Sequence, residues 1–98
     1  MNTVGFHRLA ANEYRSARTW YQKRDESVAN RFRHAVDFAL GRIIADADTH
    51  PVLVDDTRWV RVRRFPDIIV YVRESPDRLL VLAVAHVKRR PGYWKRRR

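Results

Sequence analysis

Cysteine is absent from this chain of 98 residues, which excludes disulfides, zinc–thiolate sites and cysteine nucleophiles. Long hydrophobic runs are also absent. The opening stretch MNTVGFHRLAANEY has no apolar segment long enough for a signal peptide, and no segment could span a bilayer. We therefore expect a soluble cytoplasmic protein that makes no use of a membrane. We find no repeat, low-complexity segment or linker, and a chain of this length supports one core. Residues 1–98 are thus expected to form a single domain.

Acidic residues are few, since 11 Asp and Glu stand against 21 Lys and Arg and give a formal net charge of +10. The charge is uneven along the chain. Seven of the eleven residues from Lys88 to Arg98 are cationic, whereas the stretch from Asp46 to Asp56 has four aspartates and no Lys or Arg. Such asymmetry indicates a directed surface for an anionic partner. Residues 95–98, KRRR, are expected to be a disordered and solvated basic end.

Apolar spacing predicts a strand around Thr3–His7 and then two helices that pack as a hairpin. The first helix is expected over Leu9–Arg24. Asp25 or Ser27 is expected to cap the second helix, because either side chain can accept from a free amide of the first turn. The apolar stripe of this second helix consists of Val28, Phe32, Ala35, Val36, Ala39, Leu40, Ile43 and Ile44.

After Pro51 the period changes to two, which is typical of strands. Alternating valines and arginines predict a strand over Arg58–Arg64 with one face in water. The runs IIVYV (Ile68–Val72) and LLVLAVA (Leu79–Ala85) predict two buried strands. A turn at Pro66–Asp67 precedes the first strand, and a second turn at ESPD separates the two. The expected fold class is α+β in the order β-α-α-β-β-β, with the helix hairpin on a small antiparallel sheet and a basic C-terminal tail.

The cationic strand and the end of the last strand belong to one small sheet, so their polar side chains form a candidate site. Cutting RNA without a metal needs a base, an acid and cations for the developing charge. His86 or Tyr93 could move protons, while Arg61 and Arg63 could stabilise charge. The basic half has no carboxylate cluster for a metal, and no cofactor is expected.

Simpler interpretations of these residues remain open. A basic strand face is often only solvated or covered by a partner. His86 could hydrogen-bond a turn. Tyr93 and Trp94 could fold back as an apolar lid whose polar tips reach water.

Two stretches of the sequence resemble the RelE/ParE superfamily, the toxins of type II toxin–antitoxin systems that are often labelled plasmid stabilisation proteins. The first is the N-terminal pattern of Phe6, Ala10 or Ala11, Glu13, Ala17, Trp20 and Tyr21. The second is VRRFPDIIVYV…LLVLAVAHVKRRPGYW. The resemblance covers nearly the whole chain, and the second stretch is most similar to the subgroup nearer ParE.

The resemblance implies one of two activities. RelE-like members are ribosome-dependent endonucleases that cut mRNA, whereas ParE-like members poison DNA gyrase and need no catalytic residue of their own. Nuclease members place a basic residue just ahead of the strand matching IVYV, where this chain has Ile68. Arg61 and Arg63 do match the cations of the preceding strand. Lys88 or Arg89 could match a basic residue after the last strand, and Tyr93 or Trp94 a late aromatic.

We therefore expect a toxin that arrests growth, with DNA gyrase as the favoured target and ribosome-bound mRNA as the alternative. A basic nucleic-acid-binding module without toxicity is the third possibility. Whether the chain is an enzyme stays open; as an enzyme it would be a metal-independent ribonuclease. A small acidic antitoxin that folds on binding is the expected partner in a hetero-oligomer. The residues expected to bind nucleic acid or target are Arg64, Lys88, Arg89, Arg90 and Trp94.

Overall fold

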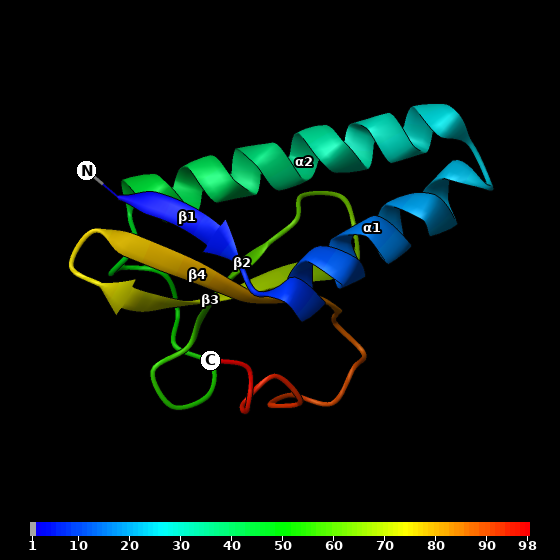
Figure 1. Cartoon of the computed structure of the whole chain (residues 1–98). Helices are drawn as coiled ribbons and strands as arrows, with labels where there is room; N and C mark the ends of the chain where they lie inside the picture. The colour runs from blue at the N-terminus through cyan, green and yellow to red at the C-terminus, as the bar shows by residue number, and fades with distance from the viewer. Residues whose placement is uncertain (1) are drawn as a thin grey trace.

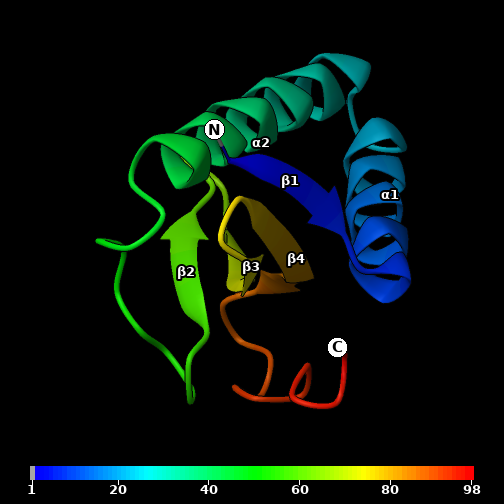
Figure 2. The same ribbon diagram turned by 60° about the vertical axis from the view of Figure 1, so that its left-hand side comes forward.

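Six elements follow one another in the computed structural model, which describes residues 2–98. They are β1 (Thr3–Phe6), α1 (Arg8–Gln22), α2 (Glu26–Ala45), β2 (Arg58–Arg61), β3 (Asp67–Ser75) and β4 (Arg78–His86). The predicted α+β fold in the order β-α-α-β-β-β is confirmed. Figure 1 shows both helices on one side of the sheet and the C-terminal segment, in red, on the other, and Figure 2 shows α2 above the sheet with the C-terminal segment below it.

The two helices begin at side chains that accept from free amides of the first turn. Asp25 caps α2: its carboxylate accepts from the backbone nitrogen of Ser27 at 2.9 Å and from the Ser27 hydroxyl at 2.8 Å. Of the two predicted caps, Asp25 is therefore the one used. His7 caps α1 by accepting from the backbone nitrogen of Leu9. Across residues 2–98, neither helix is long and apolar enough to cross a membrane.

The sheet has the strand order β1-β4-β3-β2. Strands β2, β3 and β4 form the antiparallel meander predicted from the sequence. β1 joins its other edge parallel to β4, with Thr3 opposite Arg78 and Phe6 opposite Val81, so the sheet as a whole is mixed and not purely antiparallel. Parallel neighbours need a long crossover, and the two helices with β2 and β3 supply it.

Both faces of the sheet are covered, which explains why β3 and β4 are almost continuously apolar. On one face, Phe32, Val36 and Ile43 of α2 pack in a cluster with residues such as Ile69 and Val81. On the opposite face, the cluster comprises buried Val70, Val72, Leu80, Leu82, Ala83 and Trp94, with Leu53, Val54, Trp59, Ile68 and Tyr93 packed against it. The C-terminal tail thus forms part of the core.

β4 carries an irregularity at Leu82 that changes which side chains face each layer. The register passes from Val70 opposite Ala83 directly to Tyr71 opposite Val81, so Leu82 is an extra residue in β4. Leu82 and Ala83 consequently both face the tail side, and Val84 returns to the helix side. The extra residue also changes which backbone groups point toward the free edge of the strand.

The predicted strand over Arg58–Arg64 is shorter than expected, because β2 ends at Arg61. The backbone then turns: Val62 donates to the carbonyl of Asp67 at 2.9 Å, and Phe65 donates to that of Val62 at 3.1 Å. Arg64 has a φ of 68°, in the left-handed region that a strand does not use. Arg63 and Arg64 therefore belong to the turn, since these contacts close the chain on itself before β3 begins.

Candidate target-binding surface

Glu13 of α1 is the centre of a polar cluster that fixes the C-terminal tail. Its side chain is 15% exposed. Arg97 binds it with two hydrogen bonds, one to each carboxylate oxygen, at 2.8 and 3.1 Å. The hydroxyl of Tyr93 donates to the same carboxylate at 2.8 Å, and Arg89 approaches it at 3.4 Å. Paired donors of this kind make a strong, directional contact, so one carboxylate ties α1 to three residues of the tail.

This cluster also takes the place of a strand at the edge of β4. β1 pairs with β4 only as far as Val81, because the chain leaves the sheet at Phe6 to enter α1. Beyond that point, Glu13 accepts from the backbone nitrogen of Val84 at 3.1 Å, and Arg97 donates to the carbonyl of Leu82 at 3.0 Å. Buried backbone groups need such partners. The ion pair therefore satisfies the strand edge that β1 leaves open.

Arg97 corrects the expectation of a solvated end at residues 95–98. Its side chain is only 14% exposed and is held by Glu13, whereas Lys95, Arg96 and Arg98 are exposed. Arg97 is held because the carboxylate of Glu13 and the free backbone carbonyl of Leu82 lie within its reach. The sequence of the tail reveals neither of them.

Tyr93 lies beside Glu13 with its hydroxyl already engaged. Burial raises the pKa of Tyr93 above its usual value, and the hydrogen bond to the Glu13 carboxylate raises it further. The guanidinium of Arg89 lies 3.9 Å from the centre of the Tyr93 ring. The sequence made Tyr93 a candidate proton donor, but here its proton is committed to holding the tail.

Trp94, predicted to bind the target, is 2% exposed and packs in the cluster on the tail side of the sheet. The tail folds back as the lid anticipated from Tyr93 and Trp94. The expectation that the polar tips reach water is wrong for Trp94, whose indole nitrogen is buried, while the part-buried Tyr93 hydroxyl binds Glu13. That nitrogen has no hydrogen-bond partner within residues 2–98.

His86 is exposed at the end of β4, directly opposite Asp67 of β3. Its Nδ1 accepts from the backbone nitrogen of Lys88 at 3.0 Å, which is the turn contact that the simpler interpretation proposed. Asp67 is buried, and the hydroxyl of Tyr21 donates to its carboxylate at 2.9 Å. Burial raises the pKa of Asp67 above its usual range, against the opposing effect of the Tyr21 hydrogen bond.

Two of the predicted cations, Arg61 and Arg89, share with His86 a hollow that we name the tail groove. This cavity of about 220 Å³ is lined by Leu53, Trp59, Arg61, Ile68, Ala85, His86, Val87, Arg89, Pro91 and Trp94. Arg61 reaches it because Arg61, Ile68 and Ala85 lie in register across β2, β3 and β4. His86 and Arg89 also border a wider hollow of about 690 Å³ along α1, the α1 groove, whose lining includes Trp20 and Glu13. Lys88 and Arg90 are exposed on the same segment.

Arg63 and Arg64 do not join this group. The guanidinium of Arg63 lies 4.4 Å from the ring centre of Phe38 on α2, and both arginines line a different hollow beside that helix. The predicted catalytic set is therefore divided: Arg61 and His86 share a groove, Arg63 lines another, and the Tyr93 hydroxyl is bound to Glu13.

Sequence reasoning gave no role to Glu13 or to the pairing of Arg97. One signal was present, because Glu13 is the only acidic residue between Arg8 and Gln22 and the chain ends in a dense run of cations. Trp59, which lines the tail groove, was also missed. Its position on that face depends on the register of β2 with β3.

Residues 2–98 contain no group of three or more His, Cys, Asp or Glu side chains able to hold a metal ion. In comparisons with known proteins, no family model matches the chain, and no curated protein shows significant similarity to it.

Proposed function

We propose that this chain is the toxin of a type II toxin–antitoxin module, which arrests growth in the cytoplasm by binding DNA gyrase. The proposal rests on the resemblance of the C-terminal half to ParE-like toxins, which centres on the segment AVAHVKRRPGYW. The observation that favours binding over catalysis is the hydrogen bond from Tyr93 to Glu13. It engages the late aromatic hydroxyl in fixing the tail, while Arg63 lies beside α2.

The proposed contact surface is the cationic rim at the end of β4. His86, Lys88, Arg89 and Arg90 are all exposed there, on a segment whose base is fixed by Trp94 and Arg97, and exposed Arg61 of β2 lies beside them in the tail groove. A rigid base limits the conformational entropy lost on binding, and clustered positive charge accelerates encounter with an acidic surface. Both effects suit a toxin that acts by forming a complex.

A supercoiling assay with purified gyrase tests this proposal. We expect the purified protein to inhibit supercoiling, and a variant with Arg89 and Arg90 both changed to alanine to inhibit more weakly. Arg33→Ala serves as the matched control, because Arg33 is an exposed arginine on α2 that lines neither the tail groove, nor the α1 groove, nor the hollow beside α2 that Arg63 and Arg64 line. Normal supercoiling at saturating protein would contradict the gyrase target.

A ribosome-dependent mRNA endonuclease is the second candidate, favoured by the shared position of Arg61, His86 and Arg89 in the tail groove. In this mechanism His86 moves a proton and the arginines stabilise phosphorane charge. It predicts mRNA cuts on translating ribosomes that disappear in Arg61→Ala or His86→Ala. Intact message during growth arrest would exclude it. Harmless overexpression, with nucleic-acid affinity that falls steeply with salt, would instead support the non-toxic binding module.

The proposed partner is a small acidic antitoxin, because a protein with a net charge of +10 attracts an acidic chain. Co-expression with the neighbouring reading frame is expected to restore growth. Toxicity that persists despite expression of that frame would argue against the pairing.

A further inference from the structure

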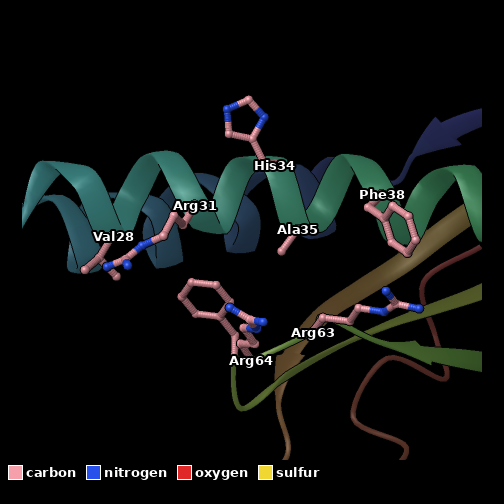
Figure 3. A pocket seen from close by; sticks show the side chains of 8 residues that line it. Val28, Arg31, His34, Ala35, Phe38, Arg63 and Arg64 are labelled. Atoms are coloured by element: carbon pink, nitrogen blue, oxygen red, sulfur yellow. The ribbon is translucent and has the colours of Figure 1, made fainter.

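A third hollow, which we name the α2 groove, lies between α2 and the turn that joins β2 to β3. It has a volume of about 550 Å³ and is lined by Val28, Arg31, His34, Ala35, Phe38, Arg63, Arg64 and Phe65. Figure 3 shows Val28, Ala35 and Phe38 on the side of α2 that faces the arginines of the turn. The imidazole of His34 points to the other side of the helix, so the arginines dominate the charge of the groove.

The floor of the α2 groove is apolar and open to solvent. Phe38 is 50% exposed, whereas Phe32, Val36 and Ile43 of the same helix are buried in the core. Val28, Ala35 and Phe65 are half-buried beside it. A single exposed apolar residue is ordinary, but a contiguous apolar strip with a polar border is typical of an interaction surface.

The border is cationic and free of carboxylates. Arg31, Arg63 and Arg64 take part in none of the five ion pairs formed among residues 2–98. Arg63 instead covers the ring of Phe38. Three arginines that form no ion pair within residues 2–98, placed around an apolar strip, make a surface complementary to a ligand that is both apolar and anionic.

From these features we propose that the α2 groove binds an acidic amphipathic helix of a partner protein. The contact positions on α2 are Val28, Arg31, Ala35 and Phe38, which span about 15 Å, or three helical turns. A partner helix of similar length can place an apolar stripe on the floor and glutamates or aspartates against the arginines. The identification of this partner with the antitoxin rests on the proposed function. The inference that the groove binds an acidic amphipathic helix rests on its lining residues and is independent of that function.

Nucleic acid fits this groove less well. Bases bind proteins by stacking on free aromatic faces, and the guanidinium of Arg63 already lies over the ring of Phe38. Phosphates would use the arginines but would leave the apolar floor uncovered. The observations therefore favour a peptide.

The test uses the full chain and a labelled synthetic peptide of about 12 residues, with leucines at helical spacing and glutamates flanking them. Binding is measured by fluorescence anisotropy at physiological salt, which screens general attraction. We expect Phe38→Ser and Arg64→Gly each to weaken binding by roughly tenfold. Arg64→Gly keeps the turn, because glycine adopts the φ of 68° without strain.

Matched controls are provided by Trp20 of α1 and by Arg24 of the turn that follows, whose guanidinium lies 3.3 Å from the ring centre of Trp20, outside the α2 groove. Trp20→Ser and Arg24→Ala are expected to leave the affinity unchanged. So is Arg33→Ala, on the far side of α2. A scrambled peptide of the same composition is expected to bind at least tenfold more weakly.

Several outcomes would overturn the proposal. If the scrambled peptide bound equally well, the peptide would be attracted by net charge alone. Equal losses of peptide affinity in Arg24→Ala and Arg64→Gly would lead to the same conclusion. Tighter binding of single-stranded RNA that depends on Phe38 and Arg64 would assign the groove to nucleic acid. Failure of the toxin assignment is distinguishable, because a chain harmless on overexpression could still bind the peptide through these two residues.

Discussion

Glu13 of α1 and Arg97 of the tail form a two-point ion pair across 84 residues of sequence, and both side chains are about 15% exposed. The pair contacts both the tail and the sheet. It holds the tail over the sheet, and it binds the backbone of Leu82 and Val84 at the open edge of β4. The stability of the tail is thereby linked to that of the sheet.

Replacing Glu13 is expected to destabilise the whole fold. Glu13→Gln leaves Arg97 buried without a counter-charge, which costs about 3 kcal/mol of unfolding free energy. Urea unfolding at neutral pH measures this loss. Glu74→Gln is the control, because Glu74 and Arg78 form an exposed pair worth less than about 1 kcal/mol. Equal losses in the two variants would contradict the central role of Glu13.

Replacing Trp94 by alanine is expected to lower the unfolding free energy much more than replacing Trp20. Trp94 is 2% exposed within a core cluster, whereas Trp20 is 52% exposed. Trp94→Ala is expected to lose about 4 kcal/mol of unfolding free energy, and Trp20→Ala about 1 kcal/mol or less. Urea unfolding measures both values. A small loss for Trp94→Ala would mean that the tail is not part of the core.

Stability is expected to fall at alkaline pH. Burial is the main cause that raises the pKa values of Tyr21, Tyr71 and Tyr93 from 10.0, in the case of Tyr71 to about 12. The unfolded chain then releases these protons before the folded chain does, so stability is full below pH 10 and declines as pH rises above it. Urea midpoints at a series of alkaline pH values measure the slope, which Tyr71→Phe is expected to reduce. A flat profile would contradict this prediction.

Two aspartates are expected to give opposite pH effects. Burial raises the pKa of Asp67, so the stability it contributes is full below 3.8 and is lost as pH rises through the folded value. Asp67→Asn stays neutral and keeps an acceptor for Tyr21. This variant should be more stable than the parent at neutral pH, by a margin that shrinks in acid.

Asp25→Asn is the matched comparison. Hydrogen bonds from Ser27 lower the pKa of Asp25, so its contribution is present above 3.8 and is lost as pH falls through the folded value. This variant should be less stable than the parent at neutral pH, with the difference again disappearing in acid. Unfolding curves at neutral and acid pH measure both variants, and the same sign for the two would refute the assignment.

Substitutions at Arg61 and His86 of the tail groove are expected to distinguish a toxin that acts by binding from one that acts as a nuclease. If the chain acts by binding, Arg61→Ala and His86→Ala should each weaken gyrase inhibition only several-fold, because exposed polar side chains on an interface rim contribute modestly. Supercoiling titrations measure this change, with Arg33→Ala as the control. Complete loss of toxicity in a folded His86→Ala protein, together with mRNA cleavage by the parent, would favour the nuclease.

The sequence by itself determined the order of elements and the burial of β3 and β4. The periods of its apolar residues and the cap at Asp25 are local properties, since they depend on neighbours within a few residues. The same alternation of valine and arginine predicted a strand longer than β2. The strand ends at Arg61, because the backbone then turns and Arg64 takes a left-handed conformation.

Only the tertiary structure decided which polar residues meet. The register of β2 with β3 and of β3 with β4 places Arg61 with His86, and the turn after Arg61 moves Arg63 to α2. Glu13 and Arg97 meet because β1 ends early and leaves a strand edge to be satisfied. These contacts join distant segments, and their register depends on packing of the whole sheet, which no local pattern specifies.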